Sequence, residues 1–264
     1  LCACGAVSPD AVASVSKNGI VTGAYTTLND AIQAVTNCTA DDKAVVTILK
    51  DIALGDNYQT ISSGVFTIDL NGHEISSTRS GYGALYITGG ATNVTIQDAG
   101  ENSKITGNFA GIEIRNNDSL TITGGTISSE YYGVYADGST VTISGGTISG
   151  ETDGMRASNS TVTINGGTIS GSDCGVYANN STVTISGGSM SGYMYDIRQY
   201  DSTIALTLGE NGIGATFPDG IMTDGILLNE ILGEGAAYWQ GSTMIIPNNR
   251  DTLIVGDDVV IKAI

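Results

Sequence analysis

Basic residues, histidine and long apolar segments are scarce in this 264-residue chain, and each shortage argues against a class of function. Only 10 lysine and arginine residues face 27 aspartate and glutamate residues, which gives a formal net charge of −17. Such a charge repels phosphate backbones and anionic lipid headgroups, so we expect no nucleic-acid partner. No apolar run approaches the roughly 18 residues of a membrane-spanning helix, so we expect no membrane insertion.

Charged residues make up only 14% of the chain, and hydrophobic residues make up 41%. The 37 glycines recur among Thr, Ser, Val and Ile instead of clustering in linkers, which is typical of a β protein with many turns. The low lysine content, the acidic balance and the abundance of Thr, Ser, Asn and Gly favour a secreted protein, extracellular or anchored to a cell surface.

The most informative feature is an internal repeat with a period of 21 residues. Four segments share the pattern of a Thr-Ile pair, two glycines and a second short apolar stretch, at residues 119–128, 140–149, 161–170 and 182–191. A fixed period of this kind indicates stacked units that bury a continuous core between them. Each unit is therefore predicted to form one coil of a solenoid.

Within one repeat, Val141 and Ile143 alternate with Thr140 and Thr142. Because successive side chains of a strand point to opposite faces, the apolar pair faces the core and the threonines face solvent. A glycine turn, a second short strand and a third strand near residues 134–136 complete the coil. The prediction is an all-β fold, a right-handed single-stranded parallel β-helix with coils of about 21 residues.

A cap is expected at each end, because an open β-helix exposes unpaired strand edges. Helical spacing is confined to residues 28–35, with Thr27 as the predicted N-cap, and this segment is the expected N-terminal capping helix. A hairpin pattern at residues 238–245 predicts a β-rich cap at the other end. The predicted domains are an N-terminal segment with the capping helix at 1–42, the β-helix coils at 43–209, and the C-terminal cap at 210–264.

Several segments resemble the pectate-lyase-like β-helix superfamily, and more closely the adhesin-like repeat proteins of the Gram-positive bacterial surface. The resemblance covers roughly residues 24–264 and depends on residues 25–32, 67–73 and 231–238 together with the Thr-Ile-Ser-Gly-Gly-Thr-Ile repeats. In that superfamily the fold serves glycan lyases, glycan hydrolases, phage tailspikes and non-catalytic adhesins. The resemblance therefore implies a fold and leaves the activity open.

A catalytic interpretation is incomplete. Residues 151–154 resemble the Asn-Thr-Asp-Gly segment of polygalacturonases, which would nominate Asp153, but no Gly-His-Gly follows and the single histidine, His73, lies upstream. Glu130 and Glu151 are one period apart, and stacked strands would place them about 4.8 Å apart, close to the separation in a retaining glycosidase. Any acidic ladder in register shows this spacing, so solvated turn carboxylates or a Ca²⁺ contact are favoured over catalysis.

A possible ligand-binding surface follows the outer side of the third strands. Aromatic and cationic side chains alternate there in the column Glu113, Tyr135, Arg156, Tyr177 and Arg198, with Tyr132 and Tyr195 in the neighbouring turns. The tyrosines could stack on sugar rings and the arginines could attract an acidic or sulfated glycan. An ordinary ladder of Arg–Tyr contacts explains the column equally well.

We interpret the chain as an extracellular adhesin-like or glycan-binding module without catalytic activity, part of a larger multidomain protein. Its expected partner is a carbohydrate or another ligand of a host or cell surface. No cofactor is expected, although a Ca²⁺ contact is possible. A polysaccharide lyase or glycoside hydrolase acting on an acidic glycan, and a passive surface spacer, remain alternatives. Cys38 is the expected disulfide partner of Cys2 or Cys4, and Cys174 is expected to be a free thiol.

Overall fold

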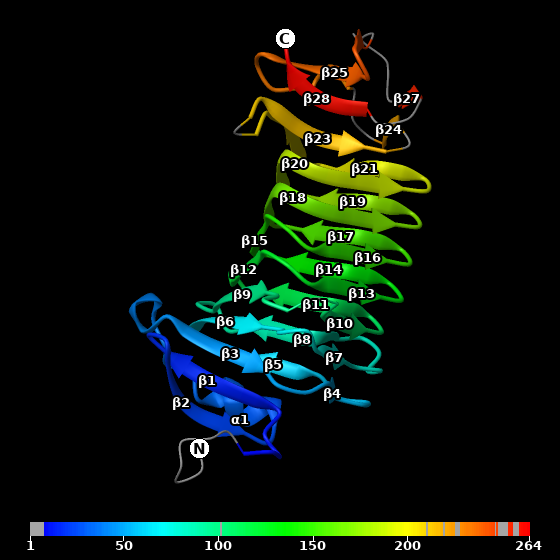
Figure 1. Ribbon diagram of the computed structural model, residues 1–264. Helices are drawn as coiled ribbons and strands as arrows, with labels where there is room; N and C mark the ends of the chain where they lie inside the picture. Colours follow the sequence, from blue (N-terminus) through cyan, green and yellow to red (C-terminus); the bar gives the residue numbers. More distant parts are fainter. Residues whose placement is uncertain are drawn as a thin grey trace.

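The computed structural model describes residues 8–100, 102–209, 211–218, 220–224, 228–245, 247, 253–255 and 259–264. The chain forms an all-β parallel solenoid of about eight turns, whose coils follow one another every 21 residues or so (Figure 1). This confirms the predicted coil architecture. No helix in the described part of the chain is long and apolar enough to cross a membrane.

Each coil contributes three strands to three columns that run along the solenoid axis. The first column contains β3 (Ala44–Ile48), β6 (Val65–Asp69), β9 (Asn93–Gln97), β12 (Ser119–Ile122), β15 (Thr140–Ile143), the first halves of β18 (Thr161–Gly171) and β20 (Thr182–Gly192), and β22 (Thr203–Leu206). The second contains β4 (Ile52–Ala53), β7 (Glu74–Ser76), β10 (Lys104–Gly107), β13 (Thr126–Ser129), β16 (Thr147–Gly150), the second halves of β18 and β20, and β23 (Ile213–Phe217). The third contains β5 (Gln59–Ile61), β8 (Gly83–Thr88), β11 (Ala110–Arg115), β14 (Tyr132–Asp137), β17 (Asp153–Ser158), β19 (Cys174–Asn179), β21 (Tyr195–Tyr200) and β24 (Gly220–Asp224).

Identical apolar side chains stack in register inside the coils. Val141, Val162 and Val183 pair along the first column, and all three are fully buried. The glycine pair after each first strand is needed where the chain turns, since Gly167 has a φ of +86° and a Cβ there would lie 2.9 Å from the Gly146 carbonyl oxygen. In β18 and β20 this turn is a bulge within one continuous strand instead of a break between two strands.

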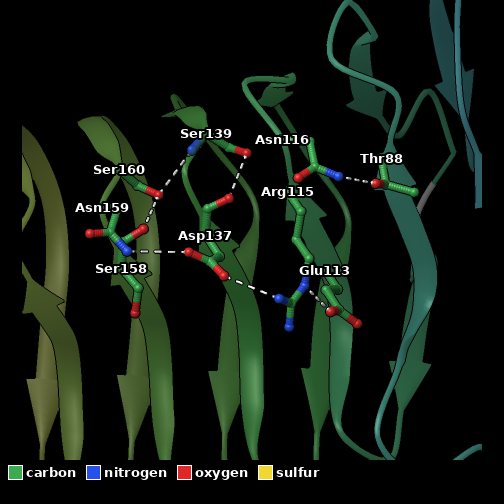
Figure 2. A network of polar contacts seen from close by, with 9 residues as sticks. All are labelled: Thr88, Glu113, Arg115, Asn116, Asp137, Ser139, Ser158, Asn159 and Ser160. Atoms are coloured by element: carbon green, nitrogen blue, oxygen red, sulfur yellow. Dashed lines mark hydrogen bonds and ion pairs between the residues drawn. The ribbon is translucent and has the colours of Figure 1, made fainter.

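The corner between the third strand and the next first strand is held by a polar ladder. Asn159 and Asn180 adopt positive φ angles of 49° and 48°, and Asn180 Nδ2 donates to Asn159 Oδ1 at 2.7 Å. At the same corner, the Ser139 backbone N–H donates to Ser160 Oγ at 3.1 Å, as Figure 2 shows. The repeated Asn and Ser at these positions therefore fix the register of each coil.

At the N-terminal end, the parallel column stops against an antiparallel hairpin that sequence reasoning did not predict. The strands β1 (Ala13–Lys17) and β2 (Ile20–Tyr25) pair with each other, and β1 pairs antiparallel with β3. Asn18 and Gly19 join them with φ angles of 50° and 77°, and an Asn-Gly pair with two positive φ angles is a favoured hairpin turn. The edge of the first column is thus covered by this hairpin instead of by a helix.

The expected helix is present but short. It is α1 (Leu28–Gln33), and Thr27 is its N-cap as predicted, because Thr27 Oγ1 accepts a hydrogen bond from the Asp30 backbone N–H at 3.1 Å. Leu28, Ala31 and Ile32 are buried, and the helix contacts β1, β2 and β5. A single 3₁₀ turn (Ala40–Asp42) follows it.

The C-terminal end also closes with antiparallel strands. The predicted hairpin is present as β25 (Ala236–Gln240) and β26 (Thr243–Ile245), and β25 pairs with β28 (Val259–Ala263), which in turn pairs antiparallel with β23. The strand β27 (Leu253–Val255) pairs antiparallel with β24. These pairings give the last parallel coil a partner of opposite direction in two columns.

Candidate functional site

The third strands bring the predicted ligand-facing residues into one column. Glu113, Tyr135, Arg156, Tyr177 and Arg198 are direct neighbours in the ladder from β11 to β21. The column also includes two residues that the sequence pattern did not reveal, Tyr86 on β8 before Glu113 and Asp224 on β24 after Arg198. These two lie outside the regular repeats, so no 21-residue alignment could place them.

The arginines and tyrosines of this column stack on one another. The Arg156 guanidinium lies 4.2 Å from the ring centre of Tyr177 and 5.1 Å from that of Tyr132. Arg198 lies 5.9 Å from Tyr177 and 5.6 Å from Tyr195. Tyr177 is therefore contacted by an arginine of the coil before it and another of the coil after it, which leaves little of its ring face for a sugar.

Each arginine of the column also has a carboxylate partner. Arg156 Nη1 lies 2.9 Å from Asp153 Oδ2, and Arg198 Nε lies 2.9 Å from Asp224 Oδ2. These ion pairs neutralise the local positive charge, so the arginines do not create the cationic track that would attract an acidic or sulfated glycan. The column has the contacts of a self-supporting ladder.

Glu113, the first residue of the predicted ligand-facing column, is buried. Its side chain is 1% exposed, Oε2 accepts from the Gly83 backbone N–H at 2.9 Å, and Oε1 accepts from Arg115 Nε at 2.6 Å. Figure 2 shows Arg115 joining Glu113 to Asp137, which lies 3.1 Å from Arg115 Nη1. Strand alternation places Glu113 opposite the buried Ile112 and Ile114, but it does not predict the contacts with Gly83 and Arg115 that close off the carboxylate.

Asp153, the candidate catalytic aspartate, is likewise buried. Only 2% of its side chain is exposed. Burial raises its pKa above the ordinary value, and the hydrogen bond from Arg156 opposes this rise. Its carboxylate is closed off by Arg156 and by Cys174 of the next coil, an arrangement that favours a structural role over that of a general base.

Cys174 is a buried free thiol, in agreement with the sequence-based expectation. Burial, reinforced by the neighbouring Asp153 carboxylate, raises its pKa to about 12.

We therefore predict that iodoacetamide will not alkylate Cys174 in the native protein at pH 8 and will do so fully in denaturant, as mapped by mass spectrometry. Rapid native alkylation would contradict the burial.

Cys38 is also a buried free thiol in the structure, and its expected partners, Cys2 and Cys4, lie outside the described residues.

The two candidate glutamates lie in a different place, a groove of about 510 Å³ along the turns between the second and third strands. Its lining consists of Ser77, Thr78, Thr106, Gly107, Asn108, Ser128, Ser129, Glu130, Ser149, Gly150, Glu151 and Ser172. Glu130 and Glu151 are both exposed, and Glu130 accepts a hydrogen bond from Asn108 Nδ2. The sequence period could have found this groove, because Glu130, Glu151 and Ser172 recur at intervals of 21 residues.

The groove crosses successive coils in register. Gly107, Ser129, Gly150 and Gly171 are paired along the second column, and the residue after each one enters the turn. Those residues are Asn108, Glu130, Glu151 and Ser172, so the groove presents one polar side chain per coil at a spacing of about 4.8 Å. His73 does not line it and pairs instead with Asp51, with Nδ1 and Oδ1 3.2 Å apart.

No group of three or more His, Cys, Asp or Glu side chains that could hold a metal ion is found among the described residues. No protein-family model matches the chain, and no curated protein or solved structure is significantly similar to it.

Proposed function

We propose that this protein is an extracellular, adhesin-like module that binds an extended, uncharged glycan in the groove of the turns and does not cleave it. The observation that carries this proposal is the groove lining. Serine and threonine hydroxyls from successive coils line it, together with one amide and two carboxylates. Such groups donate to and accept from sugar hydroxyls. The regular axial spacing favours a long ligand that lies along the solenoid.

Charge supports a neutral ligand over an acidic one. The groove contains Glu130 and Glu151 and no lysine or arginine, and the whole chain has a net charge of −17. A uronate or sulfate group would be repelled by both. The Tyr–Arg column does not compensate, because Asp153 and Asp224 pair with its arginines.

Exposed tyrosines continue the groove and offer stacking surfaces. Tyr193 follows Gly192, which pairs with Gly171, so it occupies the position of Ser172 one coil further along. It is 89% exposed, and Tyr131, beside Glu130, is 50% exposed. Aromatic rings of this kind bury the apolar faces of sugars.

A hydrolase is the second candidate, because Glu130 and Glu151 are exposed carboxylates in adjacent coils of one groove. A glycan array followed by a degradation assay on the bound glycans separates the two functions. Binding without product release is the expected result. Turnover that disappears in Glu130→Gln and Glu151→Gln variants would establish the hydrolase, and absence of all binding would leave a passive spacer.

A groove-blocking variant locates the site. Ser149→Tyr places a bulky ring in the groove and is expected to weaken binding of array-positive neutral glycans at least about tenfold, measured by calorimetry. Thr142→Tyr is the matched control, because Thr142 is also a half-buried, outward residue of the same coil, outside the groove. Equal weakening by both variants would contradict the assignment of the groove.

A further inference from the structure

The N-terminal end of the solenoid contains a second cavity, where the hairpin and the helix meet. The hairpin covers the edge of β3 and α1 contacts β5. In the chain, β4 lies between β3 and β5, and it pairs with β7 on the following coil. A cavity of about 660 Å³ that is broadly open to solvent occupies this region, and its volume exceeds that of the groove, about 510 Å³.

The cavity walls combine core residues with one fixed aromatic ring. Leu28 is buried, and Val12, Ile52 and Leu54 are partly buried against the core. The ring of Tyr58 stacks on Tyr82 with centroids 4.3 Å apart and an interplanar angle of 10°. The ring of Tyr86 also meets that of Tyr58, with centroids 5.9 Å apart and an interplanar angle of 80°, so two rings hold Tyr58 in place at the cavity.

Polar groups with unused hydrogen-bonding capacity also line the cavity. Gln59 is 5% exposed and donates Nε2 to the Thr60 carbonyl at 2.8 Å, while its Oε1 accepts no hydrogen bond from any described residue. The side-chain amides of Asn29 and Asn57 are exposed and make no hydrogen bond to the described part of the chain. These accessible groups can donate to or accept from the hydroxyls of a ligand that enters the cavity.

The cavity lining also contains a charged side chain, Asp51. Asp51 accepts a hydrogen bond from the Glu74 backbone N–H at 3.0 Å and pairs with His73 Nδ1. The first of these bonds, followed by the second, lowers the pKa of Asp51, so the carboxylate stays ionised at neutral pH. An ionised carboxylate accepts hydrogen bonds from hydroxyl groups and repels an anionic ligand.

We propose that this cavity binds a single neutral sugar ring, the end residue of the glycan class assigned to the groove, and this inference rests on the proposed function. The cavity volume lies within the range of about 300 to 1,000 Å³ that is usual for small-ligand pockets. An apolar wall with an aromatic ring matches the C–H face of a pyranose. The amides and the carboxylate match its hydroxyl edge.

Saturation-transfer difference NMR with glucose, galactose, mannose and N-acetylglucosamine tests the proposal, with glucuronate as the charged comparison. At least one neutral monosaccharide is expected to bind, and glucuronate is expected to bind more weakly. Ala53→Phe fills the cavity and should weaken binding at least about tenfold, and Asn57→Ala on the rim should weaken it several-fold. Asn37→Ala, an exposed asparagine outside the cavity, is the matched control and should have no effect.

The outcomes separate this inference from the proposed function. If neutral glycans bind in the groove with sensitivity to Ser149→Tyr, but no monosaccharide binds or Ala53→Phe and Asn57→Ala have no effect, the end-residue site is wrong and the proposed function stands. Preferential binding of glucuronate would also overturn the inference. If a monosaccharide binds in the cavity and no polysaccharide binds in the groove, the proposed function fails instead.

Discussion

A Val162→Asp variant is expected to lose the cooperative thermal transition of the native protein. Val162 is fully buried and lies in register between Val141 and Val183. The new carboxylate would be buried without a partner, at a cost of about 4 kcal/mol or more. That cost is a large part of the roughly 5–15 kcal/mol that stabilises a typical domain. Far-UV circular dichroism with thermal denaturation measures the effect.

The control is Thr163→Asp, one residue further along the same strand. Thr163 is half-buried and points outward between Thr142 and Thr184, so an aspartate there keeps contact with water. We expect a change in the free energy of unfolding within about 1 kcal/mol. A native-like unfolding midpoint for Val162→Asp would show that the inner valine column is not the core.

The coil architecture was predictable because two independent signals agree. The period of 21 residues sets the stacking register, and strand alternation decides which side chains face inward, as the pairing of Val141 with Val162 illustrates. A register shift of one residue would turn every buried valine toward solvent, so the sequence pattern specifies the register strongly. The same alignment correctly placed Tyr135, Arg156 and Tyr177 in one column.

The capping hairpin and the cavity beside it had no such support. The strands β1 and β2 do not repeat, so only the local Asn18-Gly19 pair indicates the hairpin that they form. The cavity depends on where Leu28, Ile52 and Tyr58 meet in space, although they come from a helix and two separate parts of one coil. No pattern of spacing in the sequence encodes that meeting.

The sequence also did not predict which polar side chains of the third strands are buried. Alternation gives the direction of a side chain, but it does not show what covers the side chain. Glu113 lies on the face opposite buried Ile112 and Ile114 and is still 1% exposed, and Asp153 is 2% exposed, because each carboxylate is paired with an arginine. Both carboxylates are therefore closed off from solvent, which the spacing of residues did not predict.

An Arg156→Leu variant is expected to be destabilised by about 3 kcal/mol at pH 8, because it leaves the Asp153 carboxylate buried and unpaired. Glycan binding in the groove should persist, since Arg156 does not line it. Urea denaturation measures the loss. The double variant Arg156→Leu/Asp153→Asn is the control, because an uncharged amide needs no ionic partner, and it should recover most of the lost stability.

The loss of stability caused by Arg156→Leu should become smaller as the pH falls. Burial already raises the pKa of Asp153 in the native protein, and Arg156 is the group that opposes the rise, so its removal raises this pKa further. A carboxyl whose folded-state pKa is raised contributes stability below its unfolded-state pKa, and this contribution is lost as the pH rises through the folded-state pKa. The variant and the wild type should therefore differ less at pH 4 than at pH 8, because protonation of Asp153 removes the unpaired buried charge. An equal deficit at both pH values, together with no recovery in the double variant, would show that Arg156 stabilises the solenoid by stacking on Tyr132 and Tyr177 instead of by pairing with Asp153.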